Sequence, residues 1–270
     1  LEGRPYACRE LNTINFGGIM PDGTTRLHKD GKDIATFFGQ GTFATYAVVH
    51  SRQAVRVPYE DIDLGIIAPF GCGIQTGAGA VLNTLNPKFY SSIAVFGCGT
   101  VGMSAIMAAK IAGCRNIIAV GGNPESLKLA MELGATHTVN RKECEDIAGR
   151  IKEITDGGCH YAIDTSGTSN FVKTALACLR FKGTAVVLGL TGDVTINIQQ
   201  ELMGEAKSLV GVVEGDANPK TFIPKLIEYY REGKFPVNRL MKFYDFEDIN
   251  RAFEESHQGV AIKSVLKMQP

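Results

Sequence analysis

The sequence predicts an α/β fold built on a doubly wound parallel sheet of the Rossmann type. Two observations carry this prediction: short apolar segments alternate with amphipathic helical segments between residues 92 and 213, and a glycine-rich turn joins the first apolar segment to the first helical one. A wholly apolar segment such as residues 93–96 is typical of a parallel strand that is buried on both faces. Because parallel strands need a crossover, usually a helix, the alternation indicates a sheet covered by helices on both sides.

The alternation places each element of this sheet in turn. The expected strands are residues 93–96, 116–120, 137–139, 161–164, 184–189 and 208–213. The expected helices are residues 101–112, 125–133, 143–155 and 170–179.

The two ends of the chain follow another pattern. Residues 1–64 contain turn glycines and an apolar, β-branched segment at 43–50 that predicts a strand. The tail predicts helices at 220–232 and 246–256 and a closing strand at 262–267. We therefore divide the chain at 1–66, 67–216 and 217–270, and expect the first and last parts to form a second body beside the sheet.

Composition narrows the class of protein. Of the 270 residues, 44% are hydrophobic and 21% charged, and 28 basic residues balance 28 acidic ones, so no global field favours nucleic acid or an acidic membrane. No segment approaches the roughly 18–20 apolar residues that a membrane span requires. Seven cysteines without a CxxC pair argue against a disulfide framework. We expect a soluble, cytoplasmic protein that binds neither nucleic acid nor membrane.

The glycine-rich turn predicts a dinucleotide site. Gly97, Gly99 and Gly102 form a G-x-G-x-x-G pattern between an apolar strand and a helix. In such a turn the glycines allow a tight bend, close approach of a pyrophosphate and close helix–strand packing, while the helix N-terminus attracts phosphate. The remaining reading of the pattern is a purely structural turn.

The second part of that pattern is missing. The next strand normally ends in Asp or Glu, which accepts hydrogen bonds from the adenosine ribose, whereas here Gly121 holds the place. Without a carboxylate a 2′-phosphate is no longer repelled, so relaxed specificity or a preference for NADP is expected. No Arg follows immediately, and the nearest cations in sequence are Lys128 and Arg141.

Further segments carry a resemblance to a known family. FGCGIQTG at 70–77 precedes the glycine turn, and GATHTVN follows at 134–140. Together they resemble the zinc-dependent, medium-chain alcohol dehydrogenases, and the opening EGRPYAC and the segment GVVEGDANPKTFIPKLI resemble the aryl-alcohol branch. The resemblance covers essentially the whole chain. It implies that the flanking parts are remnants of a GroES-like, β-rich catalytic domain.

The resemblance also implies an activity and its residues. The family transfers a hydride between an alcohol or aldehyde and NAD or NADP, with a catalytic zinc as Lewis acid. Cys72 is implied as a catalytic zinc ligand, and Cys8 as a remnant of a structural zinc site. The implied cofactor-binding positions are Thr76, Gly97, Gly99, Thr100, Val101, Gly102, Gly121, Ser166 and Lys263.

The family's other zinc ligands would lie upstream of Leu1, and none of the five histidines stands in an equivalent motif. We therefore expect a truncated representation of a roughly 370-residue parent. This chain alone is expected neither to bind zinc in the family's manner, since structural sites need four ligands, nor to catalyse.

Assembly and alternative functions stay open at this point. The resemblance implies a homodimer or homotetramer of the parent, with residues 208–213 as the pairing edge; the alternative is an interior strand covered by helices. One alternative function is a zinc-free quinone or enoyl reductase, in which Cys72 has no use. Another is a non-catalytic module that binds NAD or NADP.

Overall fold

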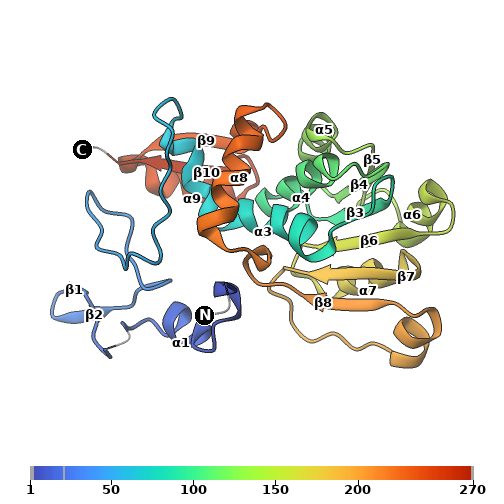
Figure 1. Ribbon diagram of the computed structural model, residues 1–270, viewed down its shortest axis with the longest axis horizontal. Helices are drawn as coiled ribbons and strands as arrows, with labels where there is room; N and C mark the ends of the chain where they lie inside the picture. Colours follow the sequence, from blue (N-terminus) through green and yellow to red (C-terminus); the bar gives the residue numbers. More distant parts are fainter. Residues whose placement is uncertain (1–2, 21, 269–270) are drawn as a thin grey trace.

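The computed structural model describes residues 3–20 and 22–268. Figure 1 shows an α/β part around a parallel sheet, beside a flanking part to which both ends of the chain contribute. The sheet has six strands in the order β5-β4-β3-β6-β7-β8, and every pair is parallel. The first strand of this sheet, β3, lies in the middle, and the later strands are added toward both edges, which confirms the predicted doubly wound fold. The strands are β3 (Ser92–Phe96), β4 (Asn116–Gly121), β5 (His137–Asn140), β6 (Cys159–Asp164), β7 (Leu179–Val187) and β8 (Ser208–Gly211).

Both faces of this sheet are buried, and alternate residues of one strand serve different faces. In β3, Ile93 and Val95 belong to one apolar cluster and Ala94 and Phe96 to another, and all four are 0% exposed. The alternation follows from the two-residue period of a strand. The crossover helices are α4 (Thr100–Ile111), α5 (Pro124–Leu133), α6 (Ile147–Thr155) and α7 (Ser169–Ala177).

Different helices cover the two apolar clusters. The first contains buried residues of α3 (Gly73–Gly79), α4, α5 and α8 (Pro219–Arg231). The second contains residues of α6 and α7. In α8 the expected apolar stripe of Phe222, Ile223, Leu226 and Ile227 is buried in the first cluster. This helix therefore ties the tail of the chain to the sheet.

The flanking part holds little regular structure before residue 64. Its described elements there are a short 3₁₀ turn (Pro5–Ala7), α1 (Leu11–Phe16) and an antiparallel hairpin of β1 (Leu27–Lys29) and β2 (Lys32–Ile34). The tail adds a parallel pair, β9 (Met241–Asp245) and β10 (Lys263–Lys267), joined by α9 (Ile249–His257). The ring centroids of Phe43 and Phe253 lie 6.4 Å apart, so the segment before residue 64 (the head) contacts the segment after residue 216 (the tail).

The strand expected at residues 43–50 is wrong. The structure shows bends and irregular backbone there, with Tyr46 89% and Val48 88% exposed. Apolar and β-branched residues favour a strand only where a neighbouring strand supplies hydrogen bonds and packing, and no described strand lies beside this segment. The division of the chain at 66/67 and 216/217 stays a prediction.

Several element boundaries also move. The helix expected from 143 begins at Ile147, because the Asp146 carboxylate caps it by accepting from Gly149 N at 2.8 Å. The strand expected from 184 begins at Leu179, and a short 3₁₀ turn, Phe246–Asp248, precedes α9. Such shifts are confined to the ends of elements and leave the topology unchanged.

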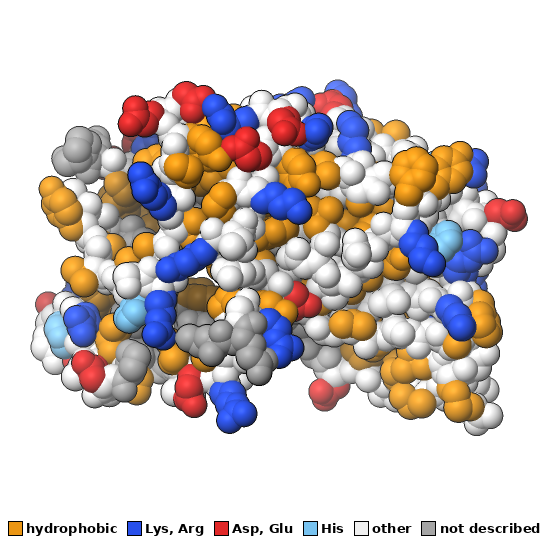
Figure 2. Space-filling model, viewed as in Figure 1, with side chains coloured by type: hydrophobic (Ala, Val, Ile, Leu, Met, Phe, Trp, Pro, Cys, Tyr) orange, Lys and Arg blue, Asp and Glu red, His pale blue; other side chains and the backbone are white. Residues whose placement is uncertain are grey.

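Among the described residues no single helix is long and apolar enough to cross a membrane. One pair, Leu64–Gly71 and Gly73–Leu85, meets the length and composition criteria together but is bent by 62°. Phe70, Ile74 and Ala78 of this pair are 0% exposed in the first core cluster. Basic, acidic and apolar side chains are interspersed on the face shown in Figure 2, in keeping with the balanced charge.

Candidate cofactor-binding site

A cavity of about 780 Å³ lies at the carboxyl edge of the sheet. In open parallel sheets this edge, where the strand order reverses, is the usual ligand site. The walls come from the ends of the central strands on one side and from the segment before β10 on the other. Of the predicted cofactor positions, Gly97, Gly99, Gly121 and Ser166 line the cavity. The other lining residues are Cys98, Val120, Gly122, Asn123, Ser126, Arg141, Lys142, Thr168, Asn170, Phe171, Ser256, His257, Gln258, Gly259, Ala261 and Ile262.

The glycine turn has the steric properties that a dinucleotide requires. Gly97 has a φ of +100°, and a Cβ there would lie 2.5 Å from Thr165 Oγ1. A Cβ on Gly102 would lie 1.9 Å from the carbonyl oxygen of Gly97, so the helix can approach the strand only with glycine. A Cβ on Gly99 would meet no atom within 4 Å, which leaves open space for a ligand. The turn therefore fits a pyrophosphate, although the binding role of these glycines stays a prediction.

Helix α4 begins directly behind this turn. Its first residue, Thr100, donates through Oγ1 to the carbonyl oxygen of Ile262 at 2.9 Å. Ile262 lines the opposite wall, so this bond joins the two sides of the cavity. A helix N-terminus offers free N–H groups and the positive end of the helix dipole, and that of α4 adjoins the cavity through Gly99.

Ser166 is fixed by a buried carboxylate at the end of β6. Asp164 is 0% exposed, and its Oδ1 accepts from Ser166 N at 3.0 Å and from Ser166 Oγ at 2.6 Å. Ser166 Oγ also lies 3.0 Å from Thr168 Oγ1. Hydrogen bonds to the buried Asp164 carboxylate and between the two hydroxyl groups therefore stabilise the loop after β6, in which Ser166 and Thr168 line the cavity.

Cys72 lies outside this cavity, at the start of α3. Thr76 Oγ1, one turn later, lies 3.0 Å from Cys72 O and 3.3 Å from Glu214 Oε2. Gln75 Nε2 donates to the same Glu214 oxygen at 3.2 Å. Glu214 follows β8 and has a φ of +51°, so this strained residue is held against α3 by two side chains.

The surroundings of Cys72 favour a neutral thiol. The residue is exposed as a whole, yet partial burial of the thiol raises its pKa, the Glu214 carboxylate raises it further, and Lys263 acts in the opposite direction. Lys263 at the start of β10 is therefore close enough to affect Cys72, rather than lining the main cavity. Burial alone raises the pKa of Cys98, in the glycine turn, to about 12.

The residues present do not assemble a complete zinc site. No group of three or more His, Cys, Asp or Glu side chains that could hold a metal occurs in residues 3–20 and 22–268. Cys8 is half-buried after the short turn Pro5–Ala7 and belongs to no such group. A zinc ion needs three or four protein ligands. No chemical step through zinc is therefore derived from this chain.

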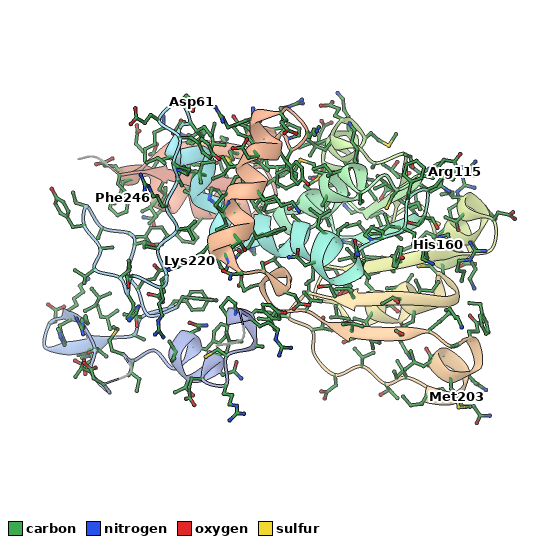
Figure 3. All side chains as sticks on the ribbon, viewed as in Figure 1. Asp61, Arg115, His160, Met203, Lys220 and Phe246 are labelled. Atoms are coloured by element: carbon green, nitrogen blue, oxygen red, sulfur yellow. The ribbon has the colours of Figure 1, made fainter. Side chains whose placement is uncertain are left out.

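His160 makes side-chain contacts with two residues, but it lies at the edge of the sheet opposite to the cavity. His160 Nδ1 is 2.9 Å from Ser92 Oγ, and Arg180 Nη1 lies 3.2 Å from His160 Nε2. Burial lowers the pKa of His160, and the charges of Arg180 and Lys88 lower it further. Figure 3 shows His160 near Arg115 at the end of the sheet away from the flanking part. This is the edge where β3 and β6 begin, so His160 is no partner for Cys72.

Sequence reasoning missed two residues of the site. Glu214 appeared only inside a segment of family resemblance, and its contact with α3 depends on a fold-back that no local pattern reveals. Arg141 was noted only as one of the nearest cations in sequence and was given no role, yet it lines the cavity. A usable signal existed, because Arg141 follows β5 directly and the carboxyl ends of neighbouring parallel strands meet at one edge.

The sheet, the glycine turn and the cavity at the carboxyl edge together have the arrangement of a Rossmann-type fold. A family model described as zinc-binding dehydrogenase matches residues 100–230. Geraniol dehydrogenase of Castellaniella defragrans is 38% identical over 269 residues, which cover 98% of this chain and 72% of that protein. The chain belongs to the zinc-binding alcohol dehydrogenase family, as the resemblance implied.

Solved structures support the same assignment. An alcohol dehydrogenase zinc-binding domain protein from Burkholderia ambifaria superimposes with a TM-score of 0.93 and 41% identity, covering 100% of this chain and 73% of that one. Benzyl alcohol dehydrogenase from Acinetobacter calcoaceticus gives a TM-score of 0.92 and 38% identity, covering 99% and 73%. These relatives confirm the predicted class of function, NAD(P)-dependent oxidoreduction of an alcohol or aldehyde. The small-molecule nature of the substrate follows from the same relatives.

Proposed function

We propose that this chain provides the cofactor-binding part of an alcohol dehydrogenase that acts on aryl or allylic primary alcohols and their aldehydes. One observation carries the proposal: the cavity at the carboxyl edge of the sheet is built on a glycine turn with open space above Gly99. The substrate class rests on two relatives named for geraniol, an allylic alcohol, and benzyl alcohol, an aryl alcohol.

The chain's own residues bind and orient the cofactor. When bound, the nicotinamide dinucleotide accepts or donates the hydride. The backbone N–H groups at the start of α4 would hold the pyrophosphate, and Ser166, fixed by Asp164, would form hydrogen bonds on the ribose side. Thr76 and Glu214 form a polar wall at the Cys72 end, where the nicotinamide would lie.

We also propose roles for the two cysteines that the family resemblance singled out. Cys72 would be one ligand of the catalytic zinc, and Cys8 one ligand of a structural zinc, in the full-length parent. For Cys72 the support is its exposed position at the start of α3, with Lys263 nearby. Cytoplasmic localisation is part of the proposal, because all seven cysteines are free, as is usual in a reducing compartment.

The test is a substrate comparison on the complete gene product and on the 270-residue chain. We expect alcohol-dependent formation of NADH or NADPH by the complete product, faster with benzyl alcohol and geraniol than with ethanol. Zinc should accompany that activity and be removable with a chelator. The 270-residue chain should bind the cofactor without turnover. Turnover with bound zinc by the 270-residue chain would contradict our assignment of the metal ligands.

A dimer across β8 is the proposed assembly. The structure places β8 at the edge of the sheet, with Leu209 36% exposed, so the alternative of an interior strand is wrong. An apolar edge strand without charged residues suits pairing with a second copy. Sedimentation should give the mass of a dimer, and the Val210→Lys variant should sediment as a monomer. A monomer at all concentrations would refute this assembly.

A further inference from the structure

We propose that this chain selects NADP over NAD, and that the Arg141 guanidinium pairs with the 2′-phosphate of the adenosine ribose. The proposal rests on the proposed function, since it requires the cavity to bind a dinucleotide. It assigns a specificity-determining role to a residue of the loop after β5, outside the glycine turn itself. Three features of the described residues carry it: the place of Arg141, the charge of the cavity and the packing around Gly121.

Arg141 is fixed at the end of the strand that normally selects the cofactor. Its backbone N–H donates to the carbonyl oxygen of Gly121 at 2.9 Å, which extends the pairing of β4 and β5 by one bond. Its side chain then lies over Gly122, because a Cβ built there would lie 2.8 Å from Arg141 Nε and 3.3 Å from Cζ. A side chain at 122 would displace the guanidinium, so glycine at this position makes room for it.

The cavity offers positive charge and no opposing carboxylate. Arg141 and Lys142 line it, and no Asp or Glu is among its lining residues. Arg141 forms no ion pair with any carboxylate in the described parts of the chain. The neighbouring Glu143 carboxylate accepts from Asn140 Nδ2 at 2.6 Å instead. A guanidinium of this kind matches a phosphate, which it can hold by two parallel hydrogen bonds.

Packing links the end of β4 to the glycine turn. A Cβ on Gly121 would lie 2.9 Å from Cys98 Sγ and 3.2 Å from Leu127 Cδ2. Cys98 belongs to the glycine turn, so its thiol occupies the space that an Asp at 121 would enter. A side chain at position 121 would therefore have to displace the Cys98 thiol, which couples positions 121 and 98.

The test is direct binding of NADPH and NADH to the 270-residue chain by fluorescence titration at low and at moderate salt. We expect NADPH to bind at least 10-fold tighter. Arg141→Ala should weaken NADPH binding by about 10- to 100-fold, the range for a lost charge-assisted hydrogen bond, and leave NADH binding nearly unchanged. Adenosine 2′,5′-bisphosphate should compete better than 5′-AMP, and this advantage should vanish in Arg141→Ala and shrink with salt.

Four further variants separate the charge of Arg141 from its geometry and from the packing around Gly121. Arg141→Lys should keep part of the preference, because it keeps the charge but loses the fork. Lys128→Ala is the matched control: Lys128 lines a neighbouring cavity and not this one, so both affinities should stay unchanged. Cys98→Ala with Gly121→Asp should shift the preference toward NADH, more than Gly121→Asp alone.

The outcomes distinguish this inference from the function on which it rests. Tighter binding of NADH, or an equal loss of both affinities in Arg141→Ala, would overturn the NADP assignment and leave the dinucleotide site intact. A folded chain that binds neither dinucleotide would overturn both.

Discussion

The sheet and the segment before it use their apolar residues in opposite ways. In the sheet, apolar side chains from alternate positions enter two closed clusters, where Phe96 and Ile118 are 0% exposed. In the head, the rings of Phe16, Phe37 and Phe38 contact one another, but Phe16 remains 55% and Phe37 65% exposed. An apolar segment therefore becomes part of a core only where other elements cover it.

The largest expected effect tests this difference directly. Phe96→Ala should lower the free energy of unfolding by about 3–5 kcal/mol, because it removes a fully buried ring that contacts α7 through Phe171 at 5.6 Å. Tyr46→Ala, which changes a residue that is 89% exposed, should stay within about 0.5 kcal/mol. Urea denaturation measures both. Similar losses in the two variants would mean that the head is packed as tightly as the sheet.

The next effect sharpens the comparison at the glycine turn. Gly102→Ala should reduce the free energy of unfolding by about 1–3 kcal/mol and lower dinucleotide affinity, because the new methyl group meets the backbone carbonyl of Gly97 at 1.9 Å. In Gly99→Ala the methyl group has no neighbour within 4 Å, so stability should fall less than in Gly102→Ala. A small loss is expected because Gly99 is the N-cap residue of α4, where glycine is preferred to alanine. Gly99→Ala should still weaken binding, since the methyl group would stand where the pyrophosphate approaches.

Denaturation and cofactor titration on the same samples separate the two roles of the turn. A loss of stability in Gly99→Ala as large as that in Gly102→Ala would show that the space above Gly99 is filled. Unchanged affinity in the same variant would place the pyrophosphate elsewhere.

The sequence predicts a region well where its structural signals are local, and poorly where the structure depends on contacts with distant segments. The sheet was predictable because its signals are local: Ile93 to Phe96 alternate between two buried faces, and Gly113 and Gly134 end helices. The strand at residues 43–50 failed because strand formation depends on a partner that the segment itself does not encode. Helix α6 begins late because one capping residue, Asp146, outweighs the propensity of the residues before it.

The site divides in the same way. Gly97, Gly99 and Gly121 were found because a contiguous turn and a strand end mark them. Ser166 and Cys72 entered only through the family resemblance. Glu214 and the placement of Arg141 depend on contacts between segments far apart in sequence, Glu214 with α3 and Arg141 with Gly122. The periodicity of one segment carries no information on such contacts.

The smallest expected effect concerns the tail, where charged side chains near solvent join α9 to β9, in contrast to the buried apolar contacts of the sheet. Glu255 on α9 pairs with Lys242 of β9, accepts from Tyr244 Oη at 2.6 Å and pairs with Arg251 at 2.9 Å. These partners, Lys242 first, lower the pKa of Glu255 from 4.5 to about 2. A carboxyl group whose pKa is lower in the folded than in the unfolded state stabilises the folded state at any pH above its unfolded pKa. This stabilisation is lost as the pH falls from about 4.5 to about 2.

Glu255→Gln should therefore be less stable than the unchanged chain at pH 6, and the difference should disappear as the pH approaches 2. The effect should be small and should shrink with salt, because the cluster lies near solvent. Glu254→Gln, on the same helix and in contact with Gln258 instead, is the matched control and should show no such pH-dependent difference. Thermal midpoints from pH 6 to pH 2 measure both variants. A Glu255→Gln difference that does not change with pH would mean that the cluster acts through packing, and would remove the contrast between the tail and the sheet.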